Sequence, residues 1–369
     1  MPGFFIDADI AKAHTLIKDF YTMPFHFEES KQKIFSNGCH FIGEYNLVKE
    51  NGACYPFVLL SGYLNEPLVL TRKNDNSLFC LSNVCTHRGN LLVYEPCKAA
   101  NIRCRYHGRL FGLDGTMISM PEFKEVENFP SAADHLQQLP LFQWGKWLFT
   151  SLNTNTKAEM FLADMMRRLS WLPVQDFVFR PDLSKNYHVN AHWALYCENY
   201  LEGFHIPFVH SDLNAVIDYG AYTTELFRYS NLQLGIAKDE EDCFDLPAFS
   251  PDYGRRIAAY YFWVFPNMMF NFYPWGLSIN IVEPVSTEHT RVSFFTYMWK
   301  EEKYNRGAGR DLDKVEMEDE EVVQHVQTGI RSQFYKHGRY SVKREQGTHH
   351  FHRLIAEFMN NEYAPAITT

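Results

Sequence analysis

The sequence predicts an α+β chain, in which a small all-β domain precedes a larger domain of helices and antiparallel sheet. Residues 41–150 consist of short strand-like runs separated by Asn, Asp, Gly and Pro. From residue 157 onward, helical periodicities alternate with long aromatic and β-branched strands. At 369 residues, with 46% hydrophobic and 21% charged residues, the chain is long enough for about two domains with sizeable cores.

Three segments follow one another along the chain. Residues 1–40 are expected to form a helical arm, because "DADIAKAHTLIKDFY" has helical spacing. Residues 41–155 form the β domain, in which the Asp-Gly pair of "GLDGTMIS" marks a hairpin and "WGKWLFTSLN" supplies a late strand. Residues 156–369 form the second domain.

The second domain is predicted to combine helices and strands. Helices are expected over 157–172, from 190, and over 313–330 and 349–359, and strands over 258–299. In "LSINIV", Leu277, Ile279 and Ile281 alternate with polar residues, which is typical of a strand. The apolar stripe of the helix over 313–330 is expected to consist of Val315, Val322, Val323 and Val326.

Composition excludes several functions. The net charge is −9 and no basic run is present, which argues against a nucleic-acid partner. The longest apolar run, 258–265, is too short to cross a bilayer, and the N-terminus carries acids where a signal peptide has basic residues. We therefore expect a cytoplasmic protein without a membrane partner. Its eight scattered cysteines do not suggest a disulfide framework, and a Cys/His cluster in a reducing compartment favours metal.

Two short motifs in the β domain each pair a cysteine with a histidine. They are "CTHRG" at 85–89 and "CRYHG" at 104–108. Zinc sites usually keep like ligands together, whereas a two-iron cluster can hold one iron by two thiolates and the other by two imidazoles. The mixed pairs therefore favour a [2Fe–2S] cluster over a zinc knuckle or an incidental pair of cysteines. Its candidate ligands are Cys85, His87, Cys104 and His107.

A second motif, "CENYLEGFHIPFVH", has the spacing E-x3-E-x2-H-x4-H. Glu198, Glu202 and His205 would fall on one face of a helix, and Pro207 would break that helix so that His210 can turn back. Two histidines and one carboxylate with open positions are the ligand set that holds Fe(II) for O2 activation. The alternative is a buried helix with two hydrogen-bonded histidines.

The third ligand must come from elsewhere, and the acidic stretch near the C-terminus offers the candidates. Asp319 can border the core, because Val323 in the apolar stripe lies four residues beyond it. Glu318 is the second choice, and most of the acids are expected on a solvated helix face. The full set of candidates is Asp311, Asp313, Glu316, Glu318, Asp319, Glu320 and Glu321.

Both motifs resemble those of the Rieske non-haem iron oxygenases. The first runs on as "CRYHGRLFGLDG", with Arg109 where that family often has Trp, and "EDEEVVQHVQTG" is similar to the family's acidic pair and Gln-x-Gly helix. The resemblance implies a Rieske [2Fe–2S] domain followed by a helix-grip (START/Bet v1-like) antiparallel-sheet catalytic domain. It also implies that mononuclear iron is held by His205, His210 and Asp319. Glu202 matches a bridging carboxylate that links His107 of one subunit to His205 of a neighbouring subunit.

Within the family, "HWALYCENYLEGFHIPFVH" and "GRYSVKREQGTHHFH" look most similar to oxygenases of quaternary ammonium compounds. The resemblance implies a homotrimeric terminal oxygenase that uses O2 to hydroxylate a choline-, betaine- or carnitine-like substrate or to demethylate it at nitrogen. Electrons would come from a separate NAD(P)H-dependent reductase, with or without a ferredoxin, since the chain lacks a dinucleotide fingerprint. Two alternatives stay open: an aromatic-ring hydroxylating oxygenase, with a dioxygenase outcome, and a non-catalytic Rieske electron carrier.

Other residues receive less specific interpretations. "HHFH" at 349–352 is expected to serve packing or a polar network, because its histidines lie on different helix faces without a carboxylate or cysteine nearby. Aromatic residues near the iron motif could form part of a cage for a trimethylammonium group or bind an aromatic ring. They are Tyr196, Phe204, Tyr260, Phe262, Phe265, Phe270, Phe272, Tyr273 and Trp275.

Overall fold

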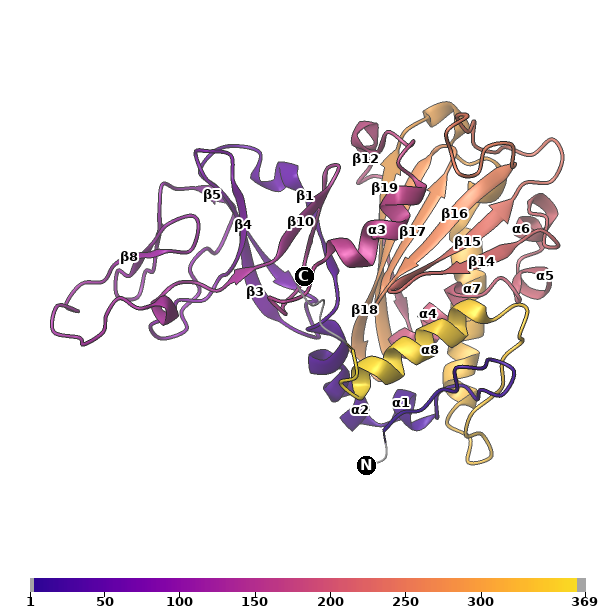
Figure 1. The fold of residues 1–369 in the computed structure, drawn as a ribbon, viewed down its shortest axis with the longest axis horizontal. Helices are drawn as coiled ribbons and strands as arrows, with labels where there is room; N and C mark the ends of the chain where they lie inside the picture. Colours follow the sequence, from indigo (N-terminus) through magenta and orange to yellow (C-terminus); the bar gives the residue numbers. More distant parts are fainter. Residues whose placement is uncertain (1–2, 364–369) are drawn as a thin grey trace. The chain divides into compact units, whose positions relative to one another are not determined.

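The computed structural model describes residues 3–363 and shows two compact units (Figure 1). The first, which we call the β unit, runs from Ser36 to Ala158. The second, the α+β unit, combines the segment that ends at Phe35 with the segment that begins at Glu159. The N-terminal segment thus belongs to the same compact unit as the second half of the chain.

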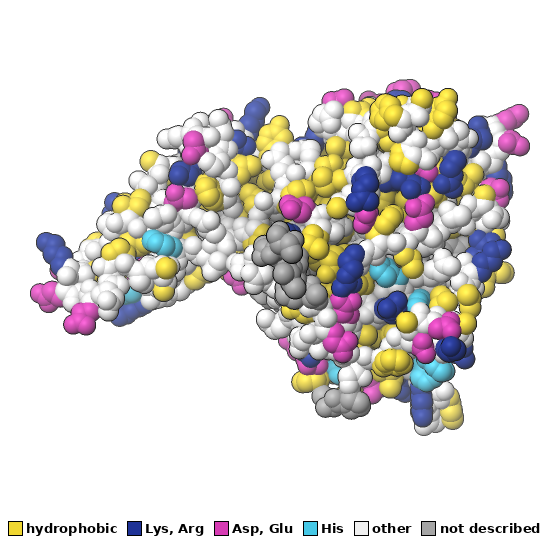
Figure 2. Space-filling model, viewed as in Figure 1, with side chains coloured by type: hydrophobic (Ala, Val, Ile, Leu, Met, Phe, Trp, Pro, Cys, Tyr) yellow, Lys and Arg dark blue, Asp and Glu magenta, His cyan; other side chains and the backbone are white. Residues whose placement is uncertain are grey.

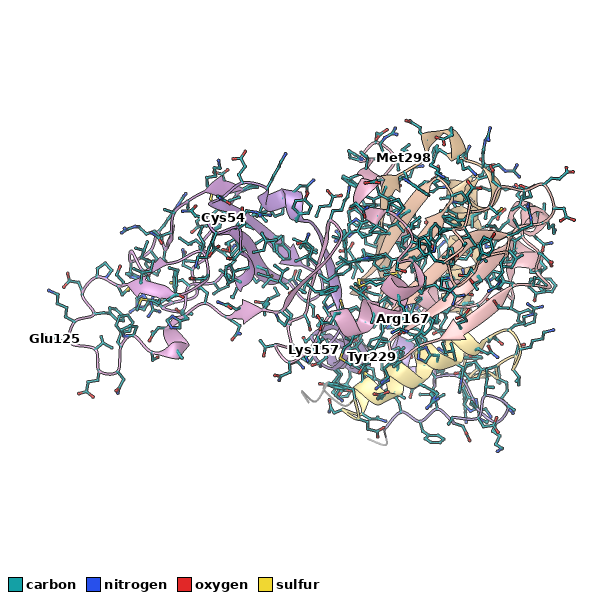
Figure 3. All side chains as sticks on the ribbon, turned by 45° about the horizontal axis from the view of Figure 1, so that its top comes forward. Cys54, Glu125, Lys157, Arg167, Tyr229 and Met298 are labelled. Atoms are coloured by element: carbon teal, nitrogen blue, oxygen red, sulfur yellow. The ribbon has the colours of Figure 1, made fainter. Side chains whose placement is uncertain are left out.

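The β unit is built from three small antiparallel sheets. Their strand orders are β1-β11-β10, β5-β2-β3-β4-β9 and β6-β7-β8. The strands are β1 (His40–Glu44), β2 (Ala53–Leu59), β3 (Glu66–Arg72), β4 (Leu78–Ser82), β5 (Cys97–Lys98), β6 (Ile102–Arg103), β7 (Leu110–Phe111), β8 (Met117–Ser119), β9 (Gln138–Leu139), β10 (Leu141–Trp144) and β11 (Trp147–Thr150). As predicted, β7 and β8 form a hairpin around the Asp-Gly pair. Glu125 lies at the outer end of the loop that follows β8 (Figure 3).

The α+β unit contains one large antiparallel sheet of order β12-β19-β18-β17-β16-β15-β14, with β13 also paired to β19. Its strands are β12 (Val178–Phe179), β13 (Lys185–Val189), β14 (Thr223–Leu226), β15 (Ser230–Ile236), β16 (Ile257–Val264), β17 (Met268–Tyr273), β18 (Gly276–Ser286) and β19 (His289–Met298). Its helices are α1 (Asp19–Thr22), α2 (Pro24–Ser30), α3 (Glu159–Arg168), α4 (Trp193–Tyr200), α5 (Ile206–Val209), α6 (Ser211–Val216), α7 (Leu312–Gly329) and α8 (Gln346–Met359). The strands predicted over 258–299 are confirmed.

Both faces of the large sheet are covered, and nearly all residues of its central strands β16, β17 and β18 are buried. On β16 the ring of Tyr260 lies beside Phe244, whereas that of Trp263, on the opposite face, packs edge-on against Phe351 of α8. Helix α4 contacts β18 and is itself packed by α7. Ser278 and Asn280 of β18 are buried although they are polar, because they line a pocket between the sheet and these helices.

The helix expected from "DADIAKAHTLIKDFY" does not form, apart from α1. Instead, backbone N–H groups of this segment bond to another segment of the same unit: Thr15 donates to Gly338 and Lys18 to Lys336. Backbone groups satisfied in this way have no need of a helix, so tertiary pairing overrides the helical spacing. The apolar stripe predicted for α7 is also partly wrong. Val323 is buried, but Val326 is 45% exposed, and the next residue, Gln327, is buried instead.

No helix within residues 3–363 is long and apolar enough to cross a membrane. On the face seen in Figure 2, acidic and basic side chains are interspersed over the α+β unit. That face therefore offers no continuous basic surface of the kind that binds nucleic acid.

Candidate active site

The two Cys/His motifs of the β unit fold into a matched pair of loops. In the first, Cys85 N–H donates to the carbonyl of Asn90, and Gly89 N–H donates to the carbonyl of Cys85, at 2.8 and 3.0 Å. In the second, Cys104 N–H donates to the carbonyl of Arg109 and Gly108 N–H to the carbonyl of Cys104, at the same two distances. The loops close so tightly because Gly89 and Gly108 adopt φ values of 68° and 78°, which glycine reaches without strain.

The four candidate cluster ligands converge between these loops. Cys85 and Cys104 are buried in the core of the β unit, and their thiols are close enough to hydrogen-bond. The rings of His87 and His107 lie edge to face, with centroids 4.7 Å apart. The buried Nδ1 of His107 has no hydrogen-bond partner in the described part of the chain. A buried nitrogen without a partner is costly unless a metal binds it. The residues present therefore fit a two-iron cluster with sulfur ligands inside and imidazoles at the edge.

Backbone amides point toward the sulfur of Cys104. Burial alone would raise the pKa of this thiol, but hydrogen bonds from the N–H groups of Tyr106 and His107, from Cys85 and from Asn90 lower it below its usual range. Hydrogen bonds of this kind favour a thiolate, which is the form that binds metal.

The side chain of Arg109, the residue that follows the second Cys/His motif, is buried. Its guanidinium donates to Thr86 Oγ1 at 2.8 Å, in the first loop, and pairs with Asp134 at 2.5 Å. The carbonyl of Arg109 accepts from Cys104 in the second loop. Arg109 thus ties the two loops together, through its side chain to the first and through its backbone carbonyl to the second. The ring of Phe123, which packs edge-on against His87, has its centroid 6.0 Å from the guanidinium.

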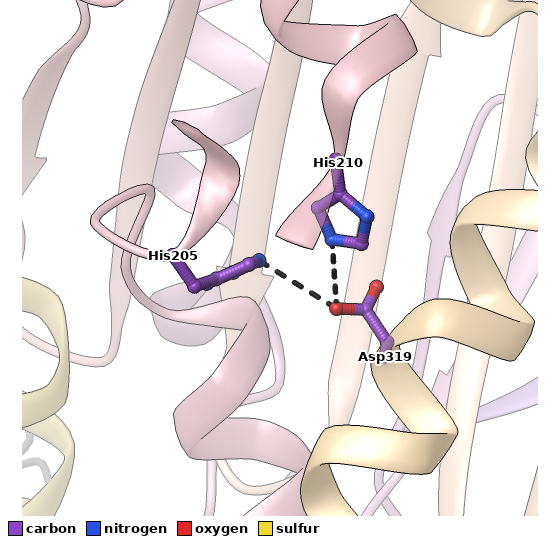
Figure 4. Close-up of side chains that lie close together, drawn as sticks. All are labelled: His205, His210 and Asp319. Carbon is purple, nitrogen blue, oxygen red and sulfur yellow. Dashed lines mark hydrogen bonds and ion pairs between the residues drawn. The ribbon is translucent and has the colours of Figure 1, made fainter. Parts of the chain in front are cut away.

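The α+β unit brings His205, His210 and Asp319 together (Figure 4). Asp319 Oδ1 lies 2.9 Å from His210 Nε2 and 3.5 Å from His205 Nε2, and one ligand atom from each residue falls within 4.8 Å of the others. Both imidazoles present Nε2 to the same carboxylate oxygen. This geometry fits a mononuclear metal with open positions, which suits Fe(II).

Each histidine is held through its other ring nitrogen by a second carboxylate. Glu202 Oε1 lies 2.7 Å from His205 Nδ1, and Glu318 Oε2 lies 2.8 Å from His210 Nδ1. Such carboxylate–histidine contacts fix the tautomer and the ring orientation at metal sites. Asp319 is oriented in turn by Asn199, whose amide donates to Oδ1 at 2.5 Å.

The prediction that one continuous helix carries Glu198, Glu202 and His205 on one face is wrong. Helix α4 ends at Tyr200, and α5 begins at Ile206. Glu202 lies in the turn between them, where its carboxylate accepts from the backbone N–H groups of Phe204 and His205. Pro207 lies in the first turn of α5 and does not break α4, since proline is well placed in a first helical turn.

Glu198 consequently faces away from the metal site. Its carboxylate accepts from the hydroxyl of Tyr21 at 2.7 Å and lies 3.1 Å from Nε2 of the buried His352. Tyr340 bonds the other nitrogen of that histidine at 2.6 Å. His352 of "HHFH" thus takes part in a polar network, as expected, but the expectation that no carboxylate lies nearby is wrong, because Glu198 approaches from another segment of the chain.

The acidic stretch does not form a single solvated face. Glu316 is only 5% exposed, and its two carboxylate oxygens lie 2.8 and 2.6 Å from the hydroxyl of Tyr196. Glu318 reaches the back of the His210 ring, whereas Asp319 reaches the side where the ligand atoms gather.

A pocket of about 110 Å³ opens next to the three ligands. Of the aromatics proposed from sequence, Tyr196 and Tyr273 line it, whereas sequence reasoning missed Tyr200, Tyr222, Tyr261 and Phe294. Only the strand parity of β16 could have indicated that Tyr261, and not Tyr260, faces the pocket. The lining is Tyr196, Asn199, Tyr200, Glu202, His205, Ile206, His210, Leu213, Tyr222, Gln233, Tyr261, Asn271, Tyr273, Ser278, Asn280, Phe294, Ala308, Leu312, Val315, Glu316 and Asp319.

Two family models match the chain. Residues 59–130 match the Rieske [2Fe-2S] domain, and residues 178–361 match the ring hydroxylating alpha subunit (catalytic domain). The chain is 27% identical to the chloroplastic choline monooxygenase of Arabidopsis thaliana over 368 residues, which cover 94% of this chain and 83% of the relative. It is 28% identical to the carnitine monooxygenase oxygenase subunit of Escherichia coli (strain K12), covering 95% of each.

Solved structures share the fold. A quaternary ammonium Rieske monooxygenase superposes with a TM-score of 0.73 at 24% identity, covering 95% of this chain and 97% of the other. Naphthalene 1,2-dioxygenase from Rhodococcus sp. superposes with a TM-score of 0.70 at 15% identity, covering 95% of each chain. With both domain models matched in order, and with relatives aligned over almost the whole length, the chain belongs to the Rieske non-haem iron oxygenases, as a catalytic α subunit.

Proposed function

We propose that this oxygenase hydroxylates a small quaternary ammonium compound, either at a carbon of its chain, such as the alcohol carbon of choline, or at an N-methyl carbon. The observation that carries the proposal is the grouping of His205, His210 and Asp319 beside a pocket lined with tyrosines. Tyrosine faces attract quaternary ammonium ions by about 0.5–2 kcal/mol per contact. Relatives named as choline and carnitine monooxygenases support the same substrate class.

The ligand sets are part of this proposal. We assign Cys85, His87, Cys104 and His107 to the [2Fe–2S] cluster, and His205, His210 and Asp319 to mononuclear iron. When bound, the two groups supply stepwise electron delivery and O2 activation. Glu202 is assigned as the bridging carboxylate, supported by its 2.7 Å contact with His205 and its place in the turn after α4.

The chain's own residues prepare the site for this chemistry. Glu202 and Glu318 accept from the Nδ1 atoms of His205 and His210, which leaves both Nε2 atoms free to bind metal. Asn199 holds Asp319 in the matching orientation. The aromatic and amide walls bury the substrate and keep bulk water from the reacting carbon.

A reductase must act with this subunit, since a Rieske oxygenase α subunit receives its electrons from a partner. We propose that the partner is a separate NAD(P)H-dependent reductase, with or without a ferredoxin, and that the subunit forms a homotrimer in which His107 and Glu202 of neighbouring subunits meet. A cytoplasmic location also stays a proposal, supported by the eight free cysteines.

Substrate-coupled O2 uptake by the purified subunit with a matching reductase tests the proposal. Choline, carnitine, other betaines and simple aromatic compounds are compared, with product analysis for each. Uptake coupled to at least one quaternary ammonium compound is expected. Coupling to aromatic compounds alone would assign the chain to ring hydroxylation instead.

Metal content separates an oxygenase from an electron carrier. About three irons per chain are expected, two in the cluster and one at the mononuclear site. About two irons, with a complete Rieske spectrum and no O2 uptake, would favour the carrier.

A further inference from the structure

The pocket beside the iron ligands has an unusual charge pattern. Apart from the two histidines, its ionisable lining among the described residues consists of acids and tyrosines, with no lysine or arginine. Glu202 and Asp319 are engaged by His205 and His210. Glu316 has no such role, so its presence in the wall calls for another explanation.

Glu316 is buried, and no cationic side chain within residues 3–363 pairs with it. Its hydrogen-bond partner is the Tyr196 hydroxyl, at 2.8 and 2.6 Å from its two oxygens. Burial raises the pKa of Glu316 well above its usual range; the Tyr196 bond opposes this, and the nearby acids Asp319, Glu320 and Asp313 add to it. A buried acid in these surroundings is stabilised in its charged form when a cation approaches.

Helix geometry places this acid close to the reacting centre. Glu316 and Asp319 both lie on α7, three residues apart, so they share one face with Cβ atoms about 5–6 Å apart. A trimethylammonium group beside Glu316 would therefore lie within reach of the iron site. Tyrosine rings of the wall, such as Tyr222 and Tyr261, can surround it.

Next to the pocket, the described residues offer no lysine or arginine without an acidic partner. A neighbouring cavity, which shares Ser278, Phe294 and Leu312 with the pocket, contains Lys185 and Lys314. Lys185 is already paired with Asp313, and Lys314 with Asp212. A carboxylate on the substrate would thus lie among acids and paired lysines, which disfavours it electrostatically.

We propose that Glu316 is the counter-ion of the substrate's ammonium group, and that the substrate is a quaternary ammonium alcohol with a net positive charge rather than a zwitterionic betaine. This inference rests on the proposed function, because it refines which quaternary ammonium compound the pocket accepts. Amide and hydroxyl groups of the wall, such as Gln233 and Asn271, suit an uncharged hydroxyl end.

Three ligands of nearly equal shape separate the contribution of the cationic group to binding from that of the hydroxyl end. Choline carries the cation and a hydroxyl; glycine betaine replaces the hydroxyl end by a carboxylate; 3,3-dimethylbutan-1-ol replaces the nitrogen by carbon. Calorimetric titration of the metal-loaded enzyme should give choline a Kd at least about tenfold below those of both analogues. Equal or tighter binding of glycine betaine or carnitine would overturn the inference while leaving a quaternary ammonium oxygenase intact.

Substitution of the acid completes the test. Glu316→Gln keeps a hydrogen bond to Tyr196 but cannot carry charge, so the Kd of choline should rise about tenfold or more while that of 3,3-dimethylbutan-1-ol stays unchanged. Glu321→Gln, an exposed acid on the same helix, is the matched control and should change neither. An unchanged choline Kd in Glu316→Gln would contradict the counter-ion role. Failure of every quaternary ammonium compound to bind, with binding of an aromatic, would instead refute the proposed function.

Discussion

At the scale of single residues, the mononuclear site is a set of histidines each held from behind by a carboxylate. His205 is held by Glu202 and His210 by Glu318, at 2.7 and 2.8 Å. These contacts set the tautomer, because the nitrogen that donates to a carboxylate leaves the other nitrogen unprotonated. The free nitrogen of each ring then faces Asp319.

Glu318→Gln tests this arrangement. The amide retains the size of the carboxylate but loses its charge, so the orientation and basicity of His210 should weaken. We expect the Fe(II) affinity of the mononuclear site to fall about 10–100-fold, measured by competition with a chelator. The cluster's visible absorption should not change, and Glu321→Gln should behave as wild type. An unaltered affinity would mean that Glu318 does not support the metal site.

Sequence could identify the residues whose spacing or chemistry is distinctive. The Cys/His pairs, the two iron-site histidines and Asp319 stand out in this way, and the structure brings the last three together. Sequence could not identify Glu316 as buried, because an acid among five others on a helix is normally solvated. It also could not select the pocket aromatics, since facing the pocket depends on strand register.

At the scale of elements, helix α4 positions the site through its two ends. Its C-terminal end leads into the turn that carries Glu202, and its N-terminus is capped by His192, whose Nδ1 accepts from the N–H of Ala194 at 3.2 Å. The ring of His192 is fully buried and lies edge-on to Phe20, Tyr21 and Phe27. The N-terminal segment thereby helps to fix the start of α4.

Burial of His192 predicts a pH-dependent stability. Burial lowers the pKa of His192 to about 3, so the folded state keeps it neutral where the unfolded chain, with a pKa near 6.5, takes up a proton. The free energy of unfolding therefore falls as the pH drops below about 6.5, by about 2 kcal/mol at pH 5 from this group alone.

His192→Asn removes the titration and keeps an acceptor for the helix cap. The loss of thermal stability between pH 7.5 and pH 5 should be about 4–8 °C smaller in this variant than in wild type, measured by circular dichroism. Metal loss and other titrations affect both proteins alike and cancel in the comparison. Equal losses in the two proteins would show that His192 is not held neutral.

The sequence predicts helices and strands correctly where a long periodic pattern of apolar residues coincides with a buried face, as in β18 and α7. They were predicted poorly where backbone hydrogen bonds found partners elsewhere. The segment around Thr15 pairs with residues near Gly338, and the turn after Tyr200 is stabilised by the Glu202 carboxylate. Neither partner is visible from local spacing.

At the scale of the whole molecule, one chain carries a site for electron entry and a site for O2 chemistry, in separate compact units. The proposed homotrimer would let the cluster of one subunit serve the iron of its neighbour. An assembly of that kind should have three times the 43.3 kDa of the chain.

Mixing two inactive variants tests transfer between subunits. Cys85→Ala lacks the cluster, and His210→Ala lacks mononuclear iron, so each alone should be inactive. Random trimers of equal amounts should recover about a quarter of wild-type activity. An active site needs the iron of a Cys85→Ala subunit and the cluster of a neighbouring His210→Ala subunit, and each of these two positions holds the required variant about half of the time. Trimers shown to be mixed by mass, yet without activity, would place the transfer within one subunit.

Single-turnover chemistry tests the central claim most directly. The purified subunit is reduced without oxygen, freed of excess reductant, and then mixed with choline and O2, and the oxidised product is measured by mass spectrometry. We predict betaine aldehyde or a demethylated amine from the wild-type chain, and none from His210→Ala with its cluster intact. Unchanged choline with oxidation of an added aromatic compound, or equal product from His210→Ala, would contradict the account.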